Sequence, residues 1–195
     1  MNKKNVSKEE KKALEEMDEL KREMPDDVKD KLDKLKTKLD KFKDAVVKKF
    51  DRHVIGISLL PPKNIDREKE RVKFEEKREL NEEELHKLKN AINILVLMDD
   101  TDSKKMGKDE LTYKLAGVLD KIAKDIDKNF FVEPMVKSEL MQSCFDARYE
   151  IIDLVAISAP LYDPREMLQA IKLTQIHKQM VLKKFEKYIV SYIAA

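Results

Sequence analysis

Apolar residues recur with helical spacing through the first quarter of the chain. From residue 28 to residue 46 they follow one another at intervals of three and four, at Val28, Leu32, Leu35, Leu39, Phe42 and Val46. Lys and Asp fill the positions between them, so the pattern predicts an amphipathic helix over residues 28–49. Because a coiled-coil seam has the same spacing, two interpretations stay open: a helix packed on its own domain, or a helix that binds a partner.

Short apolar runs farther along the chain predict buried strands. They are rich in β-branched or aromatic residues and are bounded by polar or turn-forming segments, at residues 53–60, 92–98, 130–136 and 188–194. Pro134 indicates that the third strand lies near an edge or an end of a sheet. The segment RVKFE, residues 71–75, alternates apolar with charged side chains and predicts a short exposed strand or a loop. PLYDP, residues 160–164, predicts a turn.

Helical patterns separate these strands. Asn81 followed by Glu84 indicates an N-terminal cap for a helix over residues 82–90, and Ser138 is expected to cap another. Further helices are predicted over residues 108–128, 149–159 and 165–186, the last more apolar than one buried face requires. The order predicts an α/β (α+β) fold, a small mixed sheet flanked by helices, with a charged N-terminal helical extension.

Charge and cysteine content narrow the classes of function. The chain has 41 basic and 39 acidic residues, a net charge of +2, so it has no global field that would gather nucleic acid or anionic lipid. With one cysteine it cannot form an internal disulfide, which favours a reducing, cytoplasmic setting. No apolar run is long enough to suggest a membrane span.

Several segments together resemble the nucleotidyltransferase superfamily of the DNA polymerase β type. VIGISLLPPK offers Gly56 and Ser58 where the family has adjacent Gly-Ser after a strand, and INILVLMDDTDSKKM is similar to its Asp-x-Asp strand and exit loop. FFVEPMVKSELMQS and PLYDP resemble later segments of the family. The likeness spans roughly residues 41–164 and is closest to archaeal nucleotidyltransferase-like proteins with tandem copies.

The chain departs from that family at the positions that would hold metal. In the family, two carboxylates on alternate strand residues bind two divalent ions about 4 Å apart, which clamp the triphosphate. Here the matching residues are Ala91 and Asn93, and Ile57 separates Gly56 from Ser58. Neither side chain supplies the negative charge that Mg²⁺ needs beside a polyphosphate, so no cofactor is expected.

The chain nearly repeats one segment. KKFDRHVIGISL begins at Lys48, and KKFEKYIVSYIA begins at Lys183. Both lead from a helical pattern into an apolar strand, so the second predicts the start of another copy of the domain. The expected organisation is an extension over residues 1–24, a domain over 25–187, and a terminal strand over 188–195.

Three functions are consistent with these observations. The first is a nucleotidyltransferase-like domain without its metal site, which scaffolds or regulates a protein partner, a second copy or itself as a homo-oligomer. The second is an active, Mg²⁺-dependent nucleotidyltransferase that uses Asp99 and Asp100. Those residues also suit a turn and a helix cap, so both roles stay open. The third is a coiled-coil interaction protein.

Overall fold

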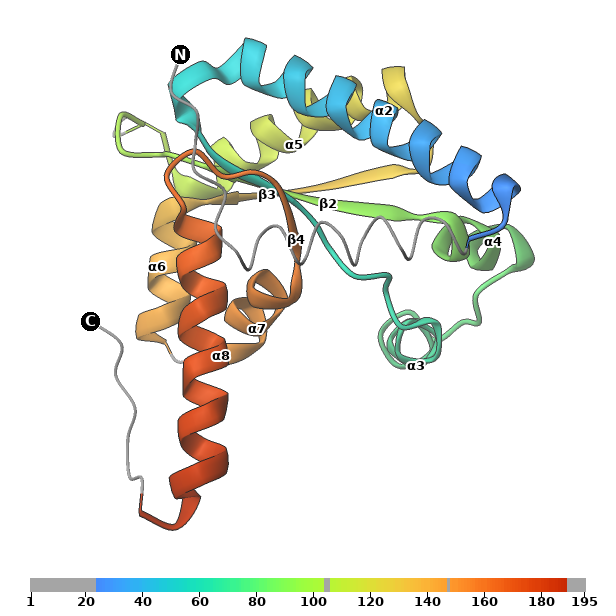
Figure 1. Cartoon of the computed structure of the whole chain (residues 1–195). Coiled ribbons are helices and arrows are strands. Elements are labelled where there is room, and N and C mark those ends of the chain that lie inside the picture. Colours follow the sequence, from blue (N-terminus) through green and yellow to red (C-terminus); the bar gives the residue numbers. More distant parts are fainter. Residues whose placement is uncertain (1–23, 104–105, 147, 189–195) are drawn as a thin grey trace. The chain divides into compact units, whose positions relative to one another are not determined.

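The computed structural model describes residues 24–103, 106–146 and 148–188 (Figure 1). The chain divides into two units between Leu39 and Asp40. The boundary falls inside helix α2 (Asp26–Phe50), which confirms the long amphipathic helix. The described part of the first unit is residues 24–39, where Pro25 and two acidic residues, Asp26 and Asp27, open the helix. The predicted N-terminal extension and terminal strand lie outside the described residues, except for Met24 and Tyr188.

The second unit is built on a four-stranded mixed sheet in the order β3-β2-β1-β4. β1 (Val54–Leu59) is antiparallel to both β2 (Ile92–Met98) and β4 (Ala159–Tyr162), and β2 is parallel to β3 (Phe130–Val136). Three strands therefore confirm the apolar runs predicted at 53–60, 92–98 and 130–136. β3 is an edge strand, as Pro134 indicated.

Helices cover both faces of this sheet. On one face Leu95 and Leu97 of β2 pack with α6 (Lys137–Phe145), α7 (Tyr149–Ile157) and α8 (Met167–Phe185). Alternation along β2 directs Ile94 and Val96 to the opposite face. That face lies against α5 (Lys108–Ile126), and Phe42 of α2 meets Phe130 edge to face at 5.9 Å (Figure 1). A mixed sheet flanked by helices is the predicted fold class.

Residues 65–75 form helix α3 (Ile65–Glu75), so the strand or loop predicted for RVKFE is wrong. The alternation of Val72 and Phe74 suggested a strand, but Phe74 is 87% exposed and only Val72 is buried. The Asn64 side chain caps the helix by accepting from the N–H groups of Asp66 and Arg67, at 3.0 and 3.1 Å. Local capping therefore decides the conformation here.

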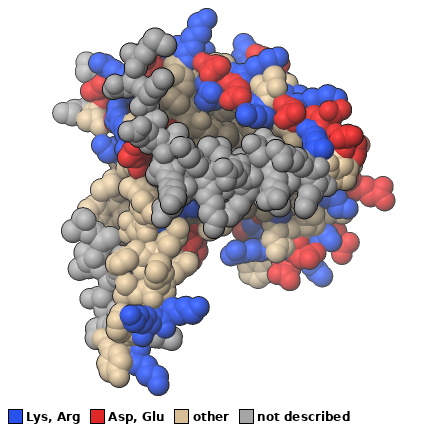
Figure 2. Space-filling view, viewed as in Figure 1, with Lys and Arg blue, Asp and Glu red and all other residues tan. Residues whose placement is uncertain are grey.

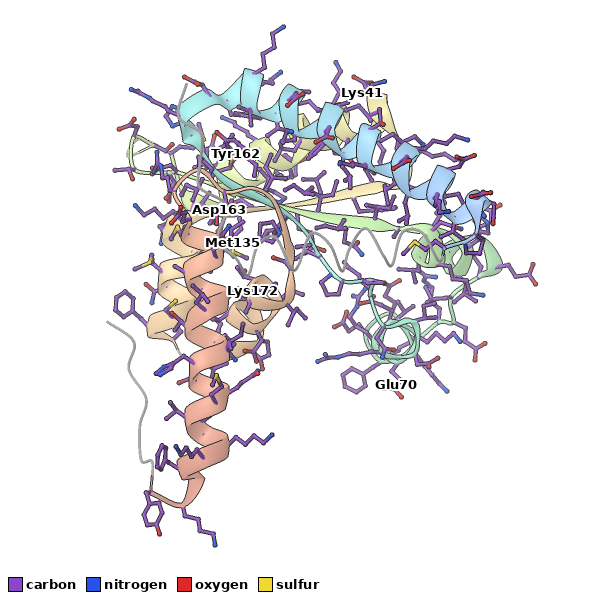
Figure 3. All side chains as sticks on the ribbon, viewed as in Figure 1. Lys41, Glu70, Met135, Tyr162, Asp163 and Lys172 are labelled. Atoms are coloured by element: carbon purple, nitrogen blue, oxygen red, sulfur yellow. The ribbon has the colours of Figure 1, made fainter. Side chains whose placement is uncertain are left out.

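PLYDP is also not simply a turn, because its first three residues belong to β4. The strand is short and lies at the sheet edge, where Pro160 is tolerated. The turn follows at Asp163, whose carboxylate accepts from the N–H groups of Met167 and Gln169 at the start of α8 (Figure 3). α4 (Glu82–Asn90) has the predicted cap in full, since Asn81 and Glu84 each accept from the other's backbone.

Two short 3₁₀ turns complete the fold, η1 (Asp51–His53) before β1 and η2 (Glu186–Tyr188) after α8. Within the residues that the structure describes, no helix is long and apolar enough to cross a membrane.

Candidate functional site

The Gly56-Ile57-Ser58 segment lies inside β1 rather than at a turn. A Cβ on Gly56 would come within 2.7 Å of Leu168 Cδ1, so α8 closes directly over this residue. Ser58 is fully buried, and within the described part of the chain its hydroxyl has no hydrogen-bond partner. Backbone N–H groups at a glycine-rich turn can approach phosphates because the turn is open. Here the equivalent segment is covered.

The two positions where the resembled family has carboxylates lie close together at the start of the second strand. Ala91 is the residue that ends α4, and Asn93 is the second residue of β2. Asn93 is only 3% exposed, and its side-chain Nδ2 has no hydrogen-bond partner among the described residues. The register of β1 against β2 directs Ser58 and Asn93 to the same face of the sheet. The motif positions thus converge, but they bring no negative charge.

Two adjoining hollows, with volumes of about 610 and 270 Å³, lie beside these positions. Asn93 lines both hollows, and Ala91 lines the smaller one. The two share three charged side chains as well, namely Lys63, Glu68 and Arg71. We call the pair the α3 hollow. Its volume suits a small ligand.

Each carboxylate that lines the α3 hollow is paired with a basic side chain. Lys63 Nζ lies 2.8 Å from Glu133, and Arg71 contacts both Glu68 and Glu75 at 2.9 Å. Arg78 joins Glu76 and Glu84 at 2.7 Å. The hydrogen bond from Arg78 lowers the pKa of Glu84, with help from the Asn81 N–H. Basic side chains therefore already neutralise these carboxylates.

Glu133 is a site residue that sequence reasoning missed. It stands on β3 opposite Leu95 of β2, so it shares the sheet face of Asn93. The alternation in FFVEPMV could have placed it on that face, but its partner Lys63 comes from the loop after β1. That pairing depends on the tertiary structure.

Asp99 follows the other end of β2 and holds three segments together. Its carboxylate accepts from the backbone and hydroxyl of Thr101 and from Arg165 at 2.9 Å. Arg165 also donates to the backbone carbonyl of Arg52, at 3.1 Å. The hydrogen bonds from Thr101 and Arg165 outweigh burial and lower the pKa of Asp99 from 3.8 to about 2. The network joins β2, the loop before α8, and η1.

Asp100 is engaged by a different element. It accepts from the backbone N–H of Ser138 at 3.1 Å and from the Ser138 hydroxyl. Ser138 was expected to cap its own helix, but α6 begins at Lys137 and has no side-chain cap. The serine instead fastens the first turn of α6 to the end of β2.

The two acid positions and the two motif positions are far apart. Asp99 lies six residue steps beyond Asn93, a span of roughly 20 Å at 3.3 Å per residue. Asp99 and Asp100 therefore cannot supply the charge that Ala91 and Asn93 lack. In the described ranges, no group of three or more His, Cys, Asp or Glu side chains is arranged to hold a metal ion.

Comparison of the chain with protein-family models, curated proteins and solved structures finds no match. The resemblance to nucleotidyltransferases therefore rests on the residues quoted above.

Proposed function

We propose that this chain is a nucleotidyltransferase-like domain without catalytic activity, which acts as a scaffold or regulatory module for a protein partner. The observation that carries the proposal is Asn93. It stands where the resembled family has a metal-binding carboxylate, it is buried in the sheet, and its amide nitrogen has no partner among the residues that the structure describes. Ala91, at the other acid position, offers no ligand atom in its side chain.

Closure of the β1 segment supports the same function. A triphosphate needs open backbone donors, whereas Leu168 lies over Gly56 and Ser58 is buried. The charges near Asn93 agree with this interpretation. Glu133, on the same sheet face, is paired with Lys63, so an ammonium group compensates the charge that would otherwise attract a cation.

Calorimetric titration tests the proposal directly. Addition of ATP or CTP with Mg²⁺ to the full chain should give no saturable heat at micromolar protein. Asp99→Ala should leave that result unchanged, because Asp99 bonds to Arg165 rather than facing the α3 hollow. Asp109→Ala, an exposed acid in the first turn of α5, is the matched control.

Micromolar binding that disappears in Asp99→Ala but persists in Asp109→Ala would overturn the proposal. It would favour the alternative of an active Mg²⁺-dependent enzyme that uses Asp99 and Asp100.

A further inference from the structure

Helix α8 exposes a line of apolar side chains to solvent. Leu173, Ile176 and Met180 are spaced by three and four residues, so they lie on one side of the helix. Their exposed fractions are 66%, 45% and 65%. We call these three residues the α8 stripe. Such large apolar groups seldom line up on a free surface without a binding role.

The α8 stripe is not part of the core. The helix packs on its own domain through another side, where Leu168 is 1% exposed in the cluster with Val155. Gln175 donates to Asp153 of α7, and Lys178 lies 4.2 Å from the Tyr149 ring. These contacts fix α8 without using the stripe.

The charge of α8 has one sign. Its 19 residues include no acidic side chain, although 39 of the 195 residues of the chain are acidic. Lys172, Lys183 and Lys184 are exposed around the stripe. In Figure 2 the α8 surface is tan with blue lysine atoms at its far end, and Figure 3 places Lys172 on the helix. The surface is therefore apolar in the middle and basic at its margins.

We propose that the α8 stripe is the docking face for an amphipathic helix of a partner protein that carries acidic residues beside its apolar seam. This inference rests on the proposed scaffold function and names its surface. The 3–4 spacing is that of a helix seam, and the lysines complement acidic flanks.

Two other occupants fit the surface less well. A second α8 would bring lysines against lysines, which disfavours pairing of two copies through this face. A membrane-surface helix usually has a broad apolar face of Trp, Phe or Leu, whereas the stripe is narrow and has only three residues.

The experiment uses two labelled synthetic peptides of about three heptads, with leucine at the a and d positions and either glutamate or lysine beside them. Fluorescence anisotropy measures binding to the full chain. The glutamate peptide should bind saturably and the lysine peptide should not. Leu173→Ser/Met180→Ser and Lys172→Glu/Lys183→Glu should each raise the Kd at least about tenfold.

Two exposed substitutions elsewhere provide matched controls. Phe74→Ser on α3 removes an exposed apolar side chain, and Lys121→Glu on α5 reverses an exposed charge. Both should leave the Kd unchanged, and circular dichroism should show that every variant is folded.

Equal binding of both peptides, binding of neither, or a Kd insensitive to the stripe would overturn the inference. So would flotation with phosphatidylserine vesicles, or dimerisation in sedimentation, that the same substitutions abolish. None of these outcomes changes the nucleotide titration. Conversely, Mg²⁺–nucleotide binding would contradict the scaffold function even if the peptide bound.

Discussion

Gly56 is the residue at which α8 approaches the sheet most tightly. A Cβ there would lie 2.7 Å from Leu168 Cδ1 and 3.0 Å from Leu168 Cγ. We expect Gly56→Ala to lower the free energy of unfolding by about 1–3 kcal/mol, because the leucine must leave its preferred rotamer. Urea denaturation measures the loss.

A double-mutant cycle identifies the cause. Leu168→Ala alone should cost about 2–5 kcal/mol, because it opens a cavity. Combined with Gly56→Ala, the total should be smaller than the sum of the two, since the new methyl group fills part of that cavity. If the two losses of unfolding free energy add strictly, the side chain at 168 and the methyl group at 56 do not compete for the same space.

Asp99 should give the protein a dependence on acid pH. Its pKa is about 2 in the folded chain and 3.8 when free of its partners. The stabilising contribution is therefore complete above pH 3.8 and is lost as the pH falls through about 2. Because Arg165 is half exposed, we expect a loss of only about 1–2 kcal/mol.

Denaturation of the wild type and of Asp99→Asn between about pH 5 and pH 2 checks this prediction. The variant should be less stable near neutrality and should have a flatter pH profile. Asp109→Asn should retain the wild-type profile. An unchanged slope in Asp99→Asn would show that another carboxylate carries the acid sensitivity.

The identities of Ala91 and Asn93, at the positions where the resembled family has carboxylates, could be read from the sequence. The partners of Asp99 could not. Arg165 lies 66 residues away from Asp99, so only folding brings the two together. The same holds for Lys63 and Glu133. Residue identity therefore shows which groups stand at these positions, and tertiary contacts decide how the charged groups pair.

At the scale of elements, the core-helix and coiled-coil interpretations make different predictions about α2. Phe42 is fully buried and packs on Phe130, whereas Leu32, in the same heptad pattern, is 45% exposed. We expect Phe42→Ala to cost about 3–5 kcal/mol and Leu32→Ala less than about 1 kcal/mol. Urea denaturation distinguishes the two.

Sedimentation of the same variants tests the coiled coil itself. If the chain associates and Leu32→Ala abolishes that association, the seam binds a partner through its first half. If neither variant changes the oligomeric state, α2 serves the core through Phe42 and Val46.

Element types were predictable where burial and local pattern agree. β2 and β3 have the predicted bounds, because both are mainly apolar runs bounded by polar segments. α3 was missed because its one buried residue, Val72, gives little helical periodicity, while the Asn64 cap and the ion pairs of Arg71 stabilise it. β4 was missed because a four-residue edge strand containing proline resembles a turn.

At the scale of the molecule, strand order was the least predictable feature. Nothing local indicates that β4 joins the free edge of β1, since that pairing links residues more than a hundred positions apart. The net charge, in contrast, can be read directly from the sequence, but it does not show how the charges are distributed. A net charge of +2 excludes a strong global field, yet α8 gathers lysines without a single acid. The net charge of the whole chain therefore does not reveal the local basic surface on α8.

The close packing of Leu168 against Gly56 has a consequence for protein engineering. Aspartates placed at 91 and 93 would stand beside the α3 hollow, but the backbone at Gly56 would stay covered by Leu168 and closed to a phosphate chain. To make room for a phosphate chain at Gly56, protein engineering would have to change the start of α8 as well as the residues at 91 and 93.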